Sequence, residues 1–131
     1  METIYREFIL DHYQRPAYKG ELNQHTVREH DSNPLCGDDL TIDILIDSNL
    51  FIRDSRFHGH GCTISQAAAD ILCGVIIGNH IDTVIGMTRE DMLELLGIEL
   101  GPVRIKCALL AYKIVKTGLI KYKGAVRGET E

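Results

Sequence analysis

Apolar positions spaced three and four residues apart predict two long helices in the second half of the chain, because this spacing places them on one helical face. The clearest pattern covers residues 63–78, where Thr63 or Ser65 is available to cap the helix start. Residues 103–118 are apolar on most sides, so we expect this helix to be central and buried, with Gly118 at its end.

Two further helices follow from the same periodicity combined with signals at their ends. Residues 2–14 show the helical spacing, and Pro16 cannot continue the helix. Residues 88–96 form a shorter helix, which Thr88 and Asp91 open with a capping box. The predicted chain therefore begins with one helix and ends with several.

Strands are predicted between these helices. Apolar and polar residues alternate over residues 39–47, which is typical of a half-buried strand. After a turn, residues 50–58 return as the second strand of a hairpin that Gly59 breaks, and residues 25–31 fit a short polar edge strand. This order predicts an α+β fold, with a small antiparallel sheet of about three strands and helices packed on one face.

The composition fits one domain over residues 1–131, since 44% hydrophobic and 25% charged residues in a chain of this length supply one small core. The formal net charge of −5 argues against nucleic acid and anionic membranes as partners, because both select basic surfaces. Basic residues do gather near the C-terminus, and we interpret them as a solvated helix face followed by a charged tail from about residue 121. They are Arg104, Lys106, Lys113, Lys116, Lys121 and Lys123.

The N-terminal residues carry charge and lead directly into an amphipathic pattern, without the apolar stretch of a signal peptide. The most apolar run, residues 71–77, is too short to span a bilayer. We therefore expect a cytoplasmic protein. In a reducing compartment, the four cysteines are expected to be metal ligands, catalytic groups or core residues rather than disulfides.

Three of the four cysteines lie at the ends of predicted elements. Cys36 lies in a turn before a strand, Cys62 lies between a strand and a helix, and Cys107 lies in the first turn of the last helix. Such positions suit metal ligands, because side chains there project from rigid elements and a helix start favours the thiolate. Cys73 lies about 15 Å further along its helix than Cys62, at roughly 1.5 Å per residue, and we interpret it as a core residue.

Asp38 is the candidate for a fourth ligand. It follows Cys36 across one glycine, so a tight turn can aim both side chains at one ion. Three thiolates and one carboxylate can complete a tetrahedral site, in which the harder oxygen donor is the easiest to release. The alternative is an aspartate that only caps the turn. His60, two residues before Cys62, could also reach the ion, although we expect His60 and His58 to be solvated side chains at a strand end.

Three motifs carry a resemblance to a known family. Residues 33–38, Asn-Pro-Leu-Cys-Gly-Asp, resemble the Asn-Pro-x-Cys-Gly-Asp signature of the IscU/SufU family of iron–sulfur cluster assembly scaffolds, which are NifU N-terminal-like. Residues 57–65, with the alanine-rich helix that follows, are similar to the second motif of this family, and residues 104–111 are similar to the third. Residues 8–13 are similar to its first helix, so the resemblance runs over about residues 3–120.

The resemblance implies a SufE/NifU-like fold and a site made by Cys36, Asp38, Cys62 and Cys107. It implies a scaffold and carrier rather than an enzyme: the protein receives sulfur from a cysteine desulfurase, binds iron, assembles a labile two-iron two-sulfur cluster and transfers it to apo-proteins. Cys36 and Cys107 are the candidate persulfide acceptors. Zinc is often found in the same site of family members.

Two departures leave the subfamily open. Lys106 stands immediately before the third cysteine, as in the SufU type, where the IscU type has histidine. The insertion of the SufU type between the second and third cysteines is absent. Residues 100–104, Leu-Gly-Pro-Val-Arg, differ at Gly101 and Arg104 from the Leu-Pro-Pro-Val-Lys chaperone-binding stretch of the IscU type. This difference argues against recognition by a specialised Hsp70 chaperone.

Three other functions remain open. The first is a zinc-dependent sulfur-transfer protein that partners a cysteine desulfurase without holding a cluster; Lys106 favours it and the missing insertion opposes it. The second is a structural zinc site that stabilises a small interaction domain. The third, a thiol hydrolase that uses cysteine and histidine, has no local motif in its support.

Overall fold

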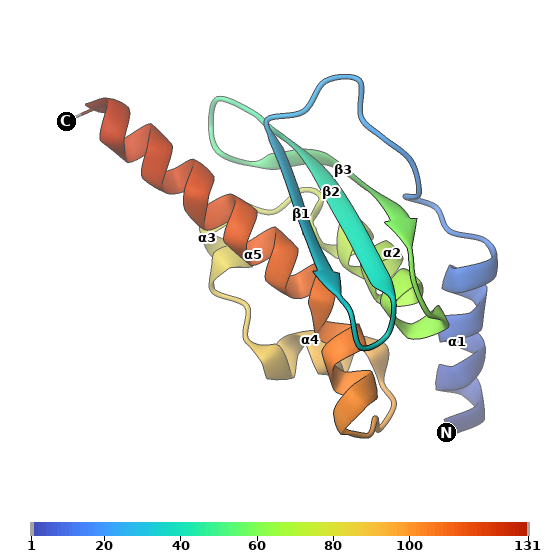
Figure 1. Cartoon of the computed structure of the whole chain (residues 1–131). Coiled ribbons are helices and arrows are strands. Elements are labelled where there is room, and N and C mark those ends of the chain that lie inside the picture. The colour runs from blue at the N-terminus through green and yellow to red at the C-terminus, as the bar shows by residue number, and fades with distance from the viewer. Residues whose placement is uncertain (1, 131) are drawn as a thin grey trace.

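A three-stranded antiparallel sheet forms one layer of the fold within residues 2–130, the part of the chain that this computed structural model describes. Its strands are β1 (Val27–Asn33), β2 (Asp38–Ile46) and β3 (Ile52–His60), with β2 at the centre (Figure 1). Asp39 of β2 pairs with the last residue of β3. The turn from β1 to β2 and the end of β3 therefore lie at the same end of the sheet.

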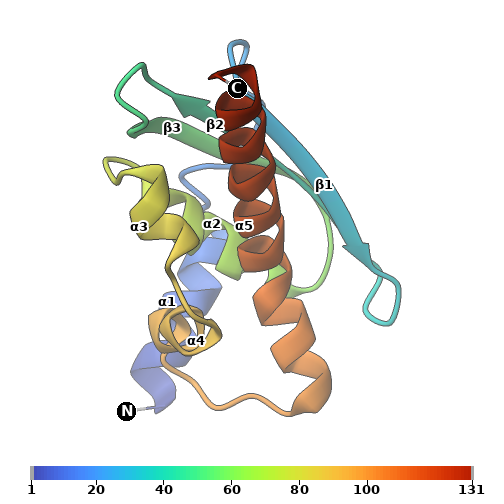
Figure 2. The ribbon, with the colours of Figure 1, turned by 90° about the vertical axis from the view of Figure 1, so that its left-hand side faces the viewer.

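The helices form the second layer, and Figure 2 shows α5 running along the sheet. α2 (Thr63–Ile76) packs against β3 and against α5 (Pro102–Thr130), which also contacts β1 and β2. α1 (Glu2–Gln14) lies against α2, while the short α3 (Ile81–Ile85) and α4 (Arg89–Leu96) contact α5. The predicted α+β fold is confirmed. Within the described residues, no helix is both long enough and apolar enough to cross a membrane.

The alternating pattern of β2 directs its apolar side chains into the core. Leu40, Ile42 and Ile44 are at most 1% exposed. Ala68 of α2 and Ala111 of α5 belong to the same buried cluster, and their small side chains let both helices approach the sheet closely. This packing fixes the starts of α2 and α5 relative to the β1–β2 turn, and Cys36, Cys62 and Cys107 lie in this region.

The prediction that Gly118 ends the last helix is wrong, because α5 continues to Thr130. A β-carbon at Gly118 would lie 2.9 Å from Cγ1 of Val27 and 3.2 Å from Cβ of Glu29. The glycine therefore allows α5 to pass closely over β1. The segment from Lys121, expected to be a frayed tail, is helical instead, and the last residue of the chain lies outside the described residues.

We expect Gly118→Leu to lower the free energy of unfolding by about 1–3 kcal/mol, because the new side chain would force α5 away from β1. Gly124→Leu is the matched control, since a β-carbon at Gly124 has no neighbour within 4 Å. Both substitutions give the helix a similar gain in propensity. Urea unfolding followed by circular dichroism measures the difference. Equal stability of the two variants would show that close packing at Gly118 is unimportant.

The strands extend further toward the cysteines than the sequence predicted. β3 continues through Gly59 to His60, where a β-carbon on Gly59 would collide with the backbone oxygen of Asp39. Glycine is therefore required for the pairing at this end of the sheet. β1 continues to Asn33, which pairs with Asp38. The turn that carries the first cysteine is thus closed by strand pairing.

Candidate metal centre

Three segments that are distant in the sequence meet at the end of the sheet where β1 turns into β2. Cys36 lies in this turn, Asp38 is the first residue of β2, Cys62 caps the start of α2, and Cys107 lies in α5. One ligand atom from each of Cys36, Asp38 and Cys107 lies within 4.8 Å of the other two. The structure therefore brings three of the four predicted ligands together, with Cys62 beside them.

The thiols of Cys36 and Cys107 are in direct contact. Cys107 donates to the Sγ of Cys36 over 2.6 Å, and the side-chain amide of Asn33 donates to the Sγ of Cys107 over 3.9 Å. Thiolates that share one zinc at about 2.3 Å lie roughly 3.8 Å apart in a tetrahedron. Binding of an ion would therefore increase the distance between these two sulfurs by about 1 Å. Gly37, at a φ of 67°, keeps the turn around Cys36 free of strain.

The Asp38 carboxylate is fixed at one oxygen and free at the other. Its Oδ1 accepts from the backbone N–H of Cys62 over 2.9 Å and from the hydroxyl of Ser65 over 3.0 Å. Its Oδ2 is buried and has no hydrogen-bond partner among the described residues. An unpaired buried carboxylate oxygen is costly unless a cation compensates it. This oxygen and the adjacent thiols therefore fit a bound metal ion.

Cys62 itself caps α2, so the prediction that Thr63 or Ser65 does so is wrong. Its Sγ accepts from the backbone N–H of Ser65 over 3.4 Å. Cys62 does not belong to the compact group formed by the other three ligands. To bind the same ion, its thiol would have to exchange the capping hydrogen bond for the metal.

Cys107 lies in the second turn of α5 and not in the first turn as predicted, since this helix begins at Pro102. It is fully buried, and burial raises the pKa of its thiol, with further increases from Cys36, Cys62 and Asp38. The prediction that a helix start favours its thiolate therefore does not hold in the metal-free chain. A metal ion must displace the proton of Cys107, because only the thiolate is a ligand.

We expect Cys73 to resist alkylation in the native protein. It is 0% exposed inside α2, and burial raises the pKa of its thiol to about 12. At about pH 8, iodoacetamide should label the half-buried Cys36 and Cys62 at least ~10-fold faster than Cys73. Peptide mass spectrometry measures the rates, and labelling in urea is the control. Equal native rates for Cys73 and Cys36 would contradict the assignment of Cys73 to the core.

Three histidines that could act as metal ligands do not belong to the group formed by Cys36, Asp38 and Cys107. His60 is exposed at the end of β3 and belongs to no group of metal-binding side chains among the described residues. Nε2 of His58 lies 3.8 Å from the carboxylate of Asp43. His12, on α1, contacts the buried carboxylate of Asp70 over 2.6 Å. The geometry therefore favours Asp38 over His60 as the ligand that accompanies the thiols.

Three residues of the site were not predicted from the sequence. Ser65 and Asn33 donate to Asp38 and to the Sγ of Cys107, respectively. A β-carbon at Gly61 would lie 2.5 Å from both Oδ1 of Asp38 and Oγ of Ser65, so only glycine leaves room for this contact. The available signal was their place in the motifs, since Asn33 opens residues 33–38 and both Gly61 and Ser65 lie within residues 57–65.

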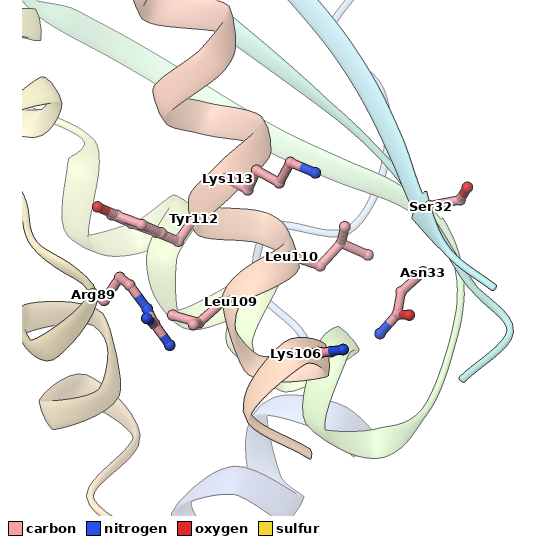
Figure 3. A pocket seen from close by; sticks show the side chains of 8 residues that line it. All are labelled: Ser32, Asn33, Arg89, Lys106, Leu109, Leu110, Tyr112 and Lys113. Carbon is pink, nitrogen blue, oxygen red and sulfur yellow. The ribbon is translucent and has the colours of Figure 1, made fainter. Parts of the chain in front are cut away.

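A groove of about 380 Å³ runs along α5 beside the site (Figure 3). Asn33 and Lys106 line the part nearest the cysteines, and Lys113 and Arg89 add positive charge. Lys113 pairs with Asp31 over 3.0 Å. Two further C-terminal lysines make ion pairs, Lys121 with Glu29 and Lys123 with Asp82. Local carboxylates therefore compensate much of the basic cluster predicted from the sequence.

Comparison with known proteins identifies the family. Residues 4–128 match the family described as NifU-like N terminal domain. The zinc-dependent sulfurtransferase SufU of Bacillus subtilis (strain 168) is 34% identical, over 95% of this chain and 95% of that protein. The iron–sulfur cluster assembly scaffold protein IscU of Thermotoga maritima is 30% identical, over 92% of this chain and 95% of that protein.

Solved structures agree with this match. FiSufU from Fervidobacterium islandicum AW-1 has a TM-score of 0.74 and 31% identity, over 90% of this chain and 98% of that chain. The N-terminal part of a NifU-like protein from Brucella abortus shares the fold, with a TM-score of 0.73 at 19% identity. The chain belongs to the NifU-like N-terminal domain family, as its three motifs predicted, and the predicted SufE/NifU-like fold is confirmed.

Proposed function

We propose that this protein is an iron–sulfur cluster assembly scaffold, which receives sulfur from a cysteine desulfurase, binds iron and transfers a two-iron two-sulfur cluster to apo-proteins. The observation that carries the proposal is the convergence of Cys36, Asp38 and Cys107, with Cys62 beside them. Soft thiolates bind iron firmly, whereas the harder carboxylate is the ligand released most easily. Such a set of ligands can hold a cluster during assembly and also release it.

Sulfur arrives on Cys36 in this proposal. Cys36 is half-buried in an exposed turn, and Leu35 before it is 72% exposed, so the cysteine of a partner can approach. Cys107, the other candidate acceptor, is 0% exposed and in contact with Cys36. Sulfur delivered from outside therefore meets Cys36 first.

Asp38 combines a fixed position with a free donor atom. The hydrogen bonds from Cys62 and Ser65 hold Oδ1, so that Oδ2 can bind or release iron without a large movement of the side chain. The hydrogen bond from the backbone N–H of Cys62 also connects Asp38 to the segment that carries this cysteine. Exchange at the carboxylate and rearrangement of this thiol are therefore linked.

A zinc-dependent sulfurtransferase that acts with a cysteine desulfurase is the second candidate. Lys106 before the third cysteine favours it, and so does the name of the Bacillus subtilis relative. Zinc held by Cys36, Asp38, Cys62 and Cys107 would keep the thiols deprotonated. This function makes the protein an enzyme, whereas the scaffold is a carrier.

The proposal places the protein in the cytoplasm, with a cysteine desulfurase and apo iron–sulfur proteins as partners. Free cysteines at all four positions suit a reducing compartment. Neither nucleic acid nor a membrane is a proposed partner. Val103 is 56% exposed at the start of α5, but Gly101 and Arg104 differ from the chaperone-binding sequence, so a specialised Hsp70 is not included.

Anaerobic reconstitution separates the two candidates. The metal-free protein is incubated with cysteine desulfurase, cysteine and ferrous iron, and iron, zinc and sulfide are measured after gel filtration. The scaffold predicts visible absorption of a two-iron two-sulfur cluster that moves to an apo-ferredoxin. Sulfur transfer by the zinc-loaded protein without cluster formation would reject the scaffold in favour of the sulfurtransferase. Metal binding without either activity would leave only a structural site.

A further inference from the structure

The contact between Cys36 and Cys107 bears on how sulfur leaves the site. Their Sγ atoms lie 2.6 Å apart, Cys36 is half-buried and Cys107 is fully buried. An incoming sulfur atom therefore meets an accessible thiol that already has a second thiol in contact with it. A second thiol beside a persulfide can release its outer sulfur as sulfide by thiol–disulfide exchange.

We propose that the thiol of Cys107 releases hydrogen sulfide from a persulfide on Cys36. The inference rests on the proposed function, since a partner must first place sulfur on Cys36. The outer sulfur accepts the proton of Cys107, and the resulting thiolate of Cys107 attacks the Sγ of Cys36, so that the bond between that Sγ and the outer sulfur breaks. The outer sulfur leaves with its own proton and the proton of Cys107. The two thiols together supply the two electrons that convert sulfane sulfur to sulfide, and they end as a disulfide.

The positions of the proton and of Asp38 fit this step. Cys107 donates toward the Sγ of Cys36 in the resting structure, so its proton lies on the side where a persulfide on Cys36 can accept it. Because the outer sulfur leaves as neutral hydrogen sulfide, it is not repelled by the nearby carboxylate of Asp38. A disulfide needs its sulfurs about 2.0 Å apart, so the pair must approach by roughly 0.6 Å.

The other two thiols are arranged differently. The Sγ of Cys62 accepts from the backbone N–H of Ser65 at the start of α2. Cys73 is fully buried within the same helix. Cys36 and Cys107 are thus the pair set up for release. Their disulfide would occupy two proposed metal ligands until a dithiol reductant reopened it.

A single-turnover experiment tests the step on the metal-free full-length chain. Cysteine desulfurase is loaded with persulfide, freed of excess cysteine and mixed with the protein without reductant. Sulfide is measured by a fluorescent probe, and the modified cysteines are identified by mass spectrometry. Wild type should release up to about one sulfide per chain and form the Cys36–Cys107 disulfide. Cys107→Ser should keep the extra sulfur atom on Cys36 and release less than about one-tenth as much sulfide.

The outcomes separate this inference from the proposed function. Cys73→Ala controls for the loss of any buried thiol and should release sulfide like wild type. A persulfide that persists on Cys36 of wild type would overturn the release step and leave the scaffold standing. Sulfide release by Cys107→Ser, or a requirement for Cys62, would overturn the release step in the same way. Absence of both persulfide and disulfide at Cys36 would instead overturn the proposed entry of sulfur, and with it the inference.

Discussion

Cys107→Ser is expected to lower the affinity for zinc and for ferrous iron at least ~100-fold, because a buried serine hydroxyl stays protonated and is a poor ligand. Cys107 occupies the position where the turn, β2 and α5 meet, with its thiol against Cys36. Reconstitution of this variant should yield almost no two-iron two-sulfur cluster. Competition with a chromophoric chelator under anaerobic conditions measures the affinity.

Cys73→Ala is the matched control for this loss. Cys73 is as deeply buried as Cys107 but lies within α2, outside the group of metal-binding side chains. Its variant should bind metal like wild type, and urea unfolding of both variants shows whether each is folded. Wild-type affinity in Cys107→Ser would contradict its role as a ligand. Equal losses in two folded variants would contradict the separation of Cys73 from the site.

Asp38→Ala is expected to slow cluster transfer to an apo-ferredoxin by ~10-fold or more, while cluster formation persists. The thiolates remain to hold the iron, but the ligand that is easiest to release is gone. Transfer can be followed by circular dichroism of the cluster. Transfer as fast as in wild type would show that Asp38 is not the ligand that exchanges.

The Asp38→Ala variant needs a control, because Asp38 also accepts hydrogen bonds from Cys62 and Ser65. Ser65→Ala removes one of these bonds and keeps the carboxylate. We expect it to change the transfer rate less than Asp38→Ala does. If Ser65→Ala slowed transfer equally, the effect would come from the Cys62 segment rather than from coordination by the carboxylate.

Elements with a complete local signal were predictable from the sequence. The alternating residues of β2 and the capping box of Thr88 and Asp91 were recognised because each pattern reports the environment of its own segment. Gly118 was misread because its reason lies on another strand, where Val27 and Glu29 leave no room for a side chain. A glycine required by tertiary contact resembles a glycine that ends a helix.

The sequence predicted which residues form the site, but not the contacts between them. The sequence predicted three cysteines as ligands from their positions at the ends of elements, namely Cys36, Cys62 and Cys107. The contact between the thiols of Cys36 and Cys107 depends instead on how α5 packs on the sheet. The free Oδ2 of Asp38 and its bond to Ser65 likewise arise from packing. Sequence spacing carries no information about such long-range contacts.

X-ray absorption spectroscopy of the zinc-loaded protein tests most directly whether three cysteines and Asp38 share one ion. We expect three sulfur neighbours at about 2.3 Å and one oxygen neighbour at about 2.0–2.2 Å. Loss of one sulfur neighbour in each of Cys36→Ser, Cys62→Ser and Cys107→Ser would assign the thiolates. A zinc surrounded mainly by nitrogen and oxygen, or a sulfur count unchanged in these variants, would contradict the account.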